Sequence, residues 1–145
     1  MKKARGPRKV RRRATKAGLP PGTAVYTGDA LAMPVRITAF DYDQDRLETL
    51  TPESAQACTR FLQTHSPTWV SVEGLQDSRL IQQICDVFGL HALTHEDILN
   101  VAQRPKLEDF GEYLFIVLDA LDQDAVNGDI TVRQISLVVG KNFLL

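Results

Sequence analysis

The residues best suited to chemistry lie in one short segment, 91–97, with the sequence His-Ala-Leu-Thr-His-Glu-Asp. His91 and His95 are four positions apart, a spacing that puts two imidazoles on one face of a helix and that zinc could use together with a carboxylate. Gly89, however, predicts the end of one helix, and Thr94 predicts the start of the next. The two histidines therefore straddle a predicted break, and we expect them to be polar loop residues.

Glu96 and Asp97 follow directly and offer the oxygen ligands that hard divalent cations prefer. If Thr94 caps the helix, both acids lie in its first turn, where carboxylates offset the helix dipole and can cap backbone N–H groups. That role requires no ligand. Adjacent helical positions point about 100° apart, so the two carboxylates would reach different neighbours. A tight cation site would need further oxygens from elsewhere.

Other chemistry finds little support in the sequence. There is no Gly-x-Ser-x-Gly elbow, and no nucleophile–base pair supports an enzyme. The segment 18–22 has prolines where a phosphate-binding loop needs backbone N–H donors. Cys58 and Cys85 lack metal-ligand spacing, and we expect buried, reduced thiols in a cytosolic compartment.

Charge divides the chain into two parts. Residues 1–16 hold nine of the 17 basic side chains and none of the 18 acidic ones. We expect 1–17 to be a disordered basic arm, since like charges repel and nothing there can be buried. No apolar stretch follows these charges, so they do not form a signal peptide. The arm could bind phosphates, but no aromatic residues interleave it, and a nucleic-acid partner is disfavoured.

The elements that must position segment 91–97 follow from periodicity and turn residues. Strands are predicted at 24–27, 34–40, 69–74, 113–121, 130–139 and 143–145, and helices at 51–66, 78–88 and 94–101. The core should include the apolar face of the first two helices, namely Ala55, Cys58, Phe61, Leu62, Leu80, Ile81, Ile84, Cys85 and Phe88. Asn127-Gly128 predicts a tight hairpin turn. This order predicts an α/β class, as a three-layer α/β/α domain with a mixed parallel and antiparallel sheet. The longest apolar runs reach only about a third of the ~20 residues that a membrane-spanning helix needs.

Three stretches follow one another along the chain: 18–28 (GLPPGTAVYTG), 68–75 (TWVSVEGL), and 88–118, which contains FGLHALTHEDILN, QRPK and EYLFIVL. Together, and in this order, they resemble the CorA family of magnesium and cobalt transporters. The resemblance identifies 18–145 as the family's N-terminal cytoplasmic domain. It implies a homopentamer at the cell inner membrane, with this domain on the cytoplasmic side. The family's membrane helices and Gly-Met-Asn loop are not in this sequence, so we expect the natural chain to continue past Leu145.

The same resemblance implies a regulatory metal site. In the family, divalent ions bind between neighbouring soluble domains and hold the closed state. By position, the ligands here are Asp97 and Glu96, with the Leu19 carbonyl as a weaker candidate, and the ion is Mg²⁺ or Co²⁺. Partner carboxylates would come from later helices of the next subunit. Two alternatives remain open at this point: a zinc-transporting branch of the same superfamily, and a free-standing cytosolic module that binds metal or nucleic acid.

Overall fold

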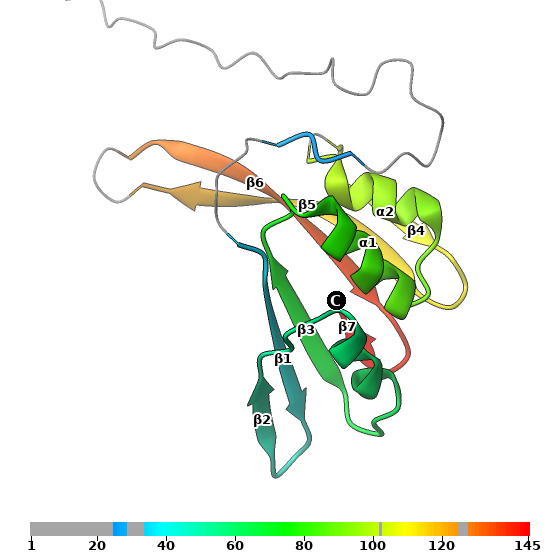
Figure 1. Cartoon of the computed structure of the whole chain (residues 1–145). Helices are drawn as coiled ribbons and strands as arrows, with labels where there is room; N and C mark the ends of the chain where they lie inside the picture. Colours follow the sequence, from blue (N-terminus) through cyan, green and yellow to red (C-terminus); the bar gives the residue numbers. More distant parts are fainter. Residues whose placement is uncertain (1–24, 29–33, 102, 125–127) are drawn as a thin grey trace, which may run out of the picture.

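A seven-stranded mixed sheet forms the framework of the computed structural model, which describes residues 25–28, 34–101, 103–124 and 128–145. The strands are β1 (Arg36–Tyr42), β2 (Leu47–Leu50), β3 (Thr68–Glu73), β4 (Lys106–Asp109), β5 (Leu114–Gln123), β6 (Ile130–Val139) and β7 (Phe143–Leu144). Their order across the sheet is β2-β1-β3-β7-β6-β5-β4, and Figure 1 shows these strands as labelled arrows. Among these pairs, β3 and β7 run parallel and the others antiparallel. The predicted α/β class with a mixed sheet is confirmed.

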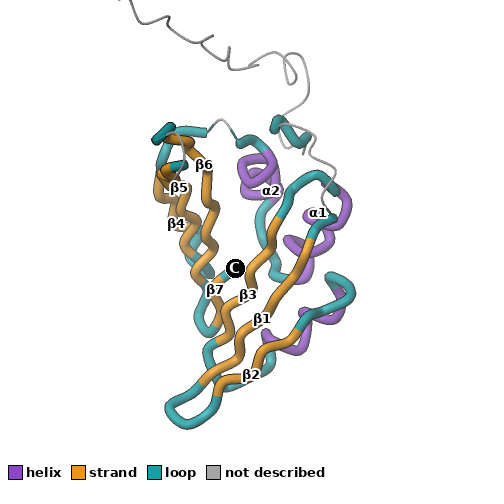
Figure 2. The backbone as a smooth tube through the Cα atoms, turned by 90° about the vertical axis from the view of Figure 1, so that its left-hand side faces the viewer, coloured by secondary structure: helices purple, strands orange, loops and turns teal. Residues whose placement is uncertain are grey.

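Three helical elements lie on one face of this sheet (Figure 2). They are the 3-10 helix η1 (Gln56–Leu62), α1 (Ser78–Val87) and α2 (Ala92–Leu99). α1 begins where the Asp77 side chain accepts a hydrogen bond from the Leu80 N–H, and Gly89 follows it with φ +65°, a left-handed conformation that glycine adopts without strain. Its buried side chains are Ile81, Ile84 and Cys85, at the spacing of one helical face.

The core lies between these helices and the facing side of the strands. Strand residues alternate in direction, so every second side chain enters the core. Those that do so from the sheet are Ile37, Ala39, Val70, Phe115, Val117 and Val138, all below 5% exposed. The side chains that alternate with them lie on the opposite face, where Trp69 and Ile135 are 46% and 40% exposed. The described residues thus form two layers of the predicted three: helices on one side and the sheet.

The first predicted helix differs most from the structure. It was expected from Thr51, but the helix begins at Gln56 and is a 3-10 helix. Ala55, Cys58 and Phe61 are three positions apart, and a 3-10 helix with three residues per turn points all of them inward. Seven of the nine predicted core residues are buried, while Leu62 and Leu80 are partly buried and pack against the core. Both cysteines are buried free thiols.

Two short edge strands, β2 and β4, were not predicted, because four residues carry too little periodicity to identify a strand. The predicted strand at 24–27 is wrong for its described part, since 25–28 lie outside any strand. The basic arm, Leu19 and Asn127 fall outside the described residues. No helix in the described ranges is long and apolar enough to cross a membrane.

Candidate metal site on helix α2

Helix α2 begins earlier than the sequence predicts. Its N-cap is His91, whose Nδ1 accepts a hydrogen bond from the Leu93 N–H at 3.2 Å, and the helix begins at Ala92. Thr94, the predicted cap, is fully buried, and its hydroxyl lies 2.8 Å from the hydroxyl of Tyr113. Histidine is not among the preferred N-cap residues, so the sequence favoured the threonine.

This shift moves the two acids along the helix. Glu96 and Asp97 are the fifth and sixth of eight residues, and the first turn contains no acid. Capping at the N-terminus therefore does not explain either carboxylate, and that interpretation of the sequence is wrong. Near the C-terminal end, where backbone carbonyls concentrate negative charge, a carboxylate is disfavoured and a cation is favoured.

Asp97 is held by two neighbours that follow it in the chain. Its Oδ1 accepts a short hydrogen bond from Gln103 Nε2, and its Oδ2 lies 2.5 Å from Lys106 Nζ. Lys106 also reaches Glu108 Oε2 at 2.8 Å. The side chains of Asp97 and Lys106 are only 17% and 26% exposed. The Asp97 carboxylate is therefore already paired with a positive charge, the ammonium group of Lys106 in the same chain.

The charge state of Lys106 follows from its partners. Burial lowers the pKa of the Lys106 ammonium, but the hydrogen bonds that it donates to Asp97 and Glu108, and the negative charge of both acids, raise it, and the net pKa is raised. The side chain thus stays positively charged throughout the neutral range. The three groups together carry one net negative charge, which still attracts a cation.

The C-terminal end of α2 is hydrogen-bonded to Thr27, in the segment 25–28 that precedes the first strand. The Thr27 N–H donates to the Leu99 carbonyl at 3.1 Å, and the Thr27 hydroxyl donates to Asn100 Oδ1 at 3.3 Å. The same hydroxyl accepts from the Val101 N–H at 3.1 Å. The first of these bonds satisfies the Leu99 carbonyl, one of the groups that a helix C-terminus leaves unpaired.

Of the other two predicted ligands, the structure describes only Glu96. Glu96 is partly buried beside Asp97, and Leu19 lies outside the described residues. No group of three or more His, Cys, Asp or Glu side chains in the described ranges could hold a metal ion. Since hard cations prefer six or more oxygens, including retained waters, Asp97 can supply at most part of a site.

The two histidines are structural, but they are not loop residues as predicted. His91 caps α2, and His95 lies within the helix, 6% exposed, with its Nε2 3.9 Å from Asp86 Oδ1 on α1. Burial lowers the pKa of His95, with a partial opposing effect from Asp86. A neutral imidazole here packs α2 against α1.

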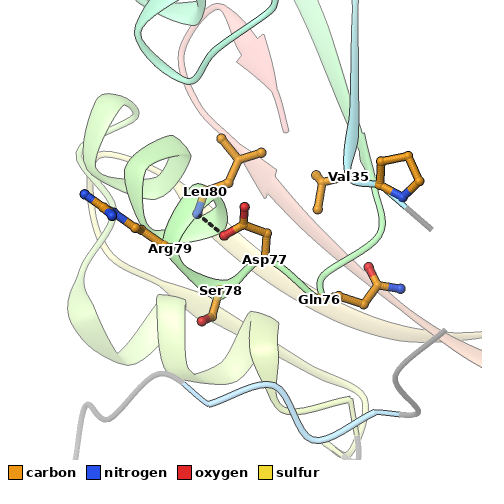
Figure 3. A pocket seen from close by; sticks show the side chains of 7 residues that line it. Val35, Gln76, Asp77, Ser78, Arg79 and Leu80 are labelled. Carbon is orange, nitrogen blue, oxygen red and sulfur yellow. Dashed lines mark hydrogen bonds between the residues drawn. The ribbon is translucent and has the colours of Figure 1, made fainter. Parts of the chain in front are cut away.

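A shallow depression lies elsewhere, at the start of α1, and Figure 3 shows the side chains around it. Its volume is about 640 Å³, and its lining includes Gln76, Asp77 and Arg79. The Asp77 carboxylate accepts from the Leu80 N–H at 3.0 Å, so it serves as the helix cap. This depression contains none of the predicted ligands.

Lys106, Gln103 and Glu108 are the residues that the sequence analysis missed. Gln103 and Lys106 had been used only as part of the family signature, with no partner assigned. A weak signal was present, because Lys106 and Glu108 are two positions apart on an edge strand, so their side chains lie on the same side of it. Nothing in the sequence placed that side against Asp97.

Comparison with known proteins identifies the family of this chain. Residues 65–145 match the model of the family described as CorA-like Mg2+ transporter protein. The chain belongs to this family. It is 36% identical, over 135 residues, to a protein of Thermotoga maritima named cobalt/magnesium transport protein CorA. That alignment covers 93% of this chain and 38% of the relative's length.

A solved structure supports the fold independently. The soluble domain of CorA from Methanocaldococcus jannaschii superposes with a TM-score of 0.50 at 15% identity. The superposition covers 75% of this chain and 38% of the other. At this identity the match supports the fold alone.

Proposed function

We propose that this chain is the cytoplasmic regulatory domain of a CorA-type transporter for Mg²⁺ or Co²⁺, and that Asp97 supplies one side of a regulatory Mg²⁺ site between subunits. The observation that carries the proposal is the position of Asp97. Its carboxylate is mostly buried in the second half of α2, past the turn where it could stabilise the helix. Lys106 supplies one positive charge to Asp97 and Glu108, and the one net negative charge that remains on these three groups supports the binding of a further cation.

The chemistry of the residues fits half of a site. Asp97 offers a hard oxygen donor, but no group of three or more His, Cys, Asp or Glu side chains in the described part of the chain could complete a site. A neighbouring subunit of a homopentamer would add the missing carboxylate, and waters would fill the remaining positions. A site of this kind binds weakly, in the millimolar range that suits a sensor of free cytosolic Mg²⁺.

The gating hypothesis follows from charge. When Mg²⁺ is abundant, it bridges Asp97 to an acid of the next subunit and stabilises a closed ring at the inner membrane. When Mg²⁺ falls, the carboxylates repel across the interface and the ring opens. Because an ion shifts such an equilibrium only by its differential affinity for the two states, five weak sites would act together.

The test replaces Asp97 with Asn in the full-length transporter. Loss of a charged contact typically costs ~1.5–3 kcal/mol, so the Mg²⁺ concentration that half-protects the protein from proteolysis should rise about tenfold or more. The control is Asp122→Asn, which removes the same charge from an exposed pair with Arg133. An unchanged Mg²⁺ midpoint in a folded Asp97→Asn protein would overturn the proposal.

A further inference from the structure

Both carboxylate oxygens of Asp97 are already in use. Gln103 occupies one and Lys106 the other, the latter at 2.5 Å. A divalent cation attracts the same lone pairs as an ammonium group does, and two cations cannot share one oxygen closely without strong repulsion. Any Mg²⁺ that reaches Asp97 Oδ2 must therefore displace Lys106 Nζ.

Lys106 has a second ion-pair partner, Glu108. Its Nζ also contacts Glu108 Oε2 at 2.8 Å, and Glu108 is more exposed than Asp97, at 42% against 17%. Lys106 and Glu108 alternate on the edge strand β4, so a rotation of the lysine side chain suffices to leave one acid and stay with the other. The Phe115 ring, with its centroid 5.5 Å from Nζ, contributes a further favourable contact for the ammonium.

We propose that Lys106 is a built-in competitor for the divalent cation at Asp97. In the metal-free subunit its ammonium neutralises Asp97, and when Mg²⁺ binds it moves to Glu108. The proposal rests on the regulatory role of Asp97 proposed above and adds how the affinity of that site is set. Lys106 weakens Mg²⁺ binding. When the ion leaves, the ammonium of Lys106 again neutralises the largely buried carboxylate of Asp97, so that this charge is not left without a partner.

Two substitutions have opposite expected effects. Lys106→Gln removes the competitor and should lower the Mg²⁺ midpoint about three- to tenfold, the factor expected from losing a partly buried ion pair. Glu108→Gln removes the alternative partner, holds Lys106 on Asp97 and should raise the midpoint about two- to fivefold. Lys106→Arg keeps the charge and should leave the midpoint within about twofold of wild type.

The experiment measures Mg²⁺ binding to the full-length transporter and does not depend on measuring transport. MgCl₂ is titrated at constant ionic strength, and the midpoint is read from protection against proteolysis and from the melting temperature. The matched control is Arg36→Gln, which removes the same charge from an exposed pair with Glu73 whose side chains are 65% and 61% exposed. Its midpoint should not change.

The outcomes separate the two proposals. If Asp97→Asn raises the midpoint while folded Lys106→Gln leaves it unchanged or raises it, Lys106 is no competitor and only this inference fails. If Asp97→Asn has no effect, the regulatory role of Asp97 fails first. Should Lys106→Gln not fold, Glu108→Gln decides alone, and a lowered or unchanged midpoint there overturns the inference.

Discussion

The two faces of the sheet carry similar side chains in different surroundings. On the helix-covered face, Phe115 and Val138 are 0% and 1% exposed and lie opposite each other on β5 and β6. One step along each strand, on the other face, Leu114 and Val139 are also opposite each other and are 36% and 37% exposed. Both faces are apolar, and the described helices cover one of them.

The difference shows which face of the sheet stabilises the fold. Burial removes apolar area from water and stabilises the fold by about 25 cal/mol per Å², so the covered face holds the domain together. The opposite face, which includes Phe40, Trp69 and Ile135, leaves apolar side chains partly exposed in the described part of the chain. The ion pairs of Lys106 with Asp97 and Glu108 lie at the edge of the covered face, where Lys106 of β4 contacts α2.

Phe115→Ala on the covered face should have the largest effect. The side chain is fully buried, so its removal leaves a cavity and should lower the free energy of unfolding by about 3–5 kcal/mol. Urea denaturation followed by circular dichroism measures this. Phe115→Leu, which keeps most of the volume, should lose clearly less, and a loss below about 1 kcal/mol for Phe115→Ala would contradict the assigned core.

Tyr113→Phe tests the polar contact buried beneath α2. The Tyr113 hydroxyl accepts from the His91 N–H at 3.0 Å and meets the buried Thr94 hydroxyl at 2.8 Å. Removing it leaves the threonine hydroxyl without this partner, and unfolding should become easier by about 1–3 kcal/mol. Tyr42→Phe, at a tyrosine 45% exposed, should change stability by less than about 0.5 kcal/mol. Equal effects in the two variants would show that the buried contact has no special weight.

Acid should weaken the packing of α2 on α1 through His95. Burial lowers the pKa of His95 below its ordinary 6.5, so below that pH the unfolded chain takes up a proton that the folded chain resists. Stability from this group is complete above pH 6.5 and is lost as the pH falls toward the folded pKa. Melting temperatures at pH 7.5 and about 5.5 should therefore differ more in the wild type than in His95→Gln. An identical pH dependence would remove His95 from this role.

Trp69→Ser on the uncovered face should have the smallest effect on stability. The side chain is 46% exposed, and we expect a change below about 1 kcal/mol in the isolated chain. Fluorescence of a dye that binds apolar surfaces should fall, because part of the exposed patch is gone. The matched control is Val70→Ser at the next residue of β3, which is fully buried and should lose much more stability. Similar losses at both positions would erase the distinction between the faces.

Much of the framework could be predicted from the sequence. β6 has the predicted bounds, α1 differs by one residue, and β3, β5 and β7 agree within two residues. These elements have strong periodicity or clear turn residues, which act over a few neighbouring positions. η1 was mistaken for a longer helix because spacing by three and by four cannot be told apart in so short a segment.

The start of α2 required tertiary information. Thr94 is a good cap by type, but burial against Tyr113 engages its hydroxyl, and His91 takes over the cap. The consequence for Glu96 and Asp97 is large, because the cap lies three residues earlier, at His91 instead of Thr94, and this moves both acids out of the first turn. Their expected structural role disappears with that shift.

The sequence by itself determined the α/β class, the family and the segment that contains Asp97, since periodicity and motif order are local properties of the chain. Tertiary structure decided what Asp97 contacts. Lys106 and Glu108 lie on an edge strand too short to predict, and the turn between α2 and β4 brings them to the helix. A contact between side chains on different elements depends on how those elements pack, and packing is set by the core rather than by the residues that meet.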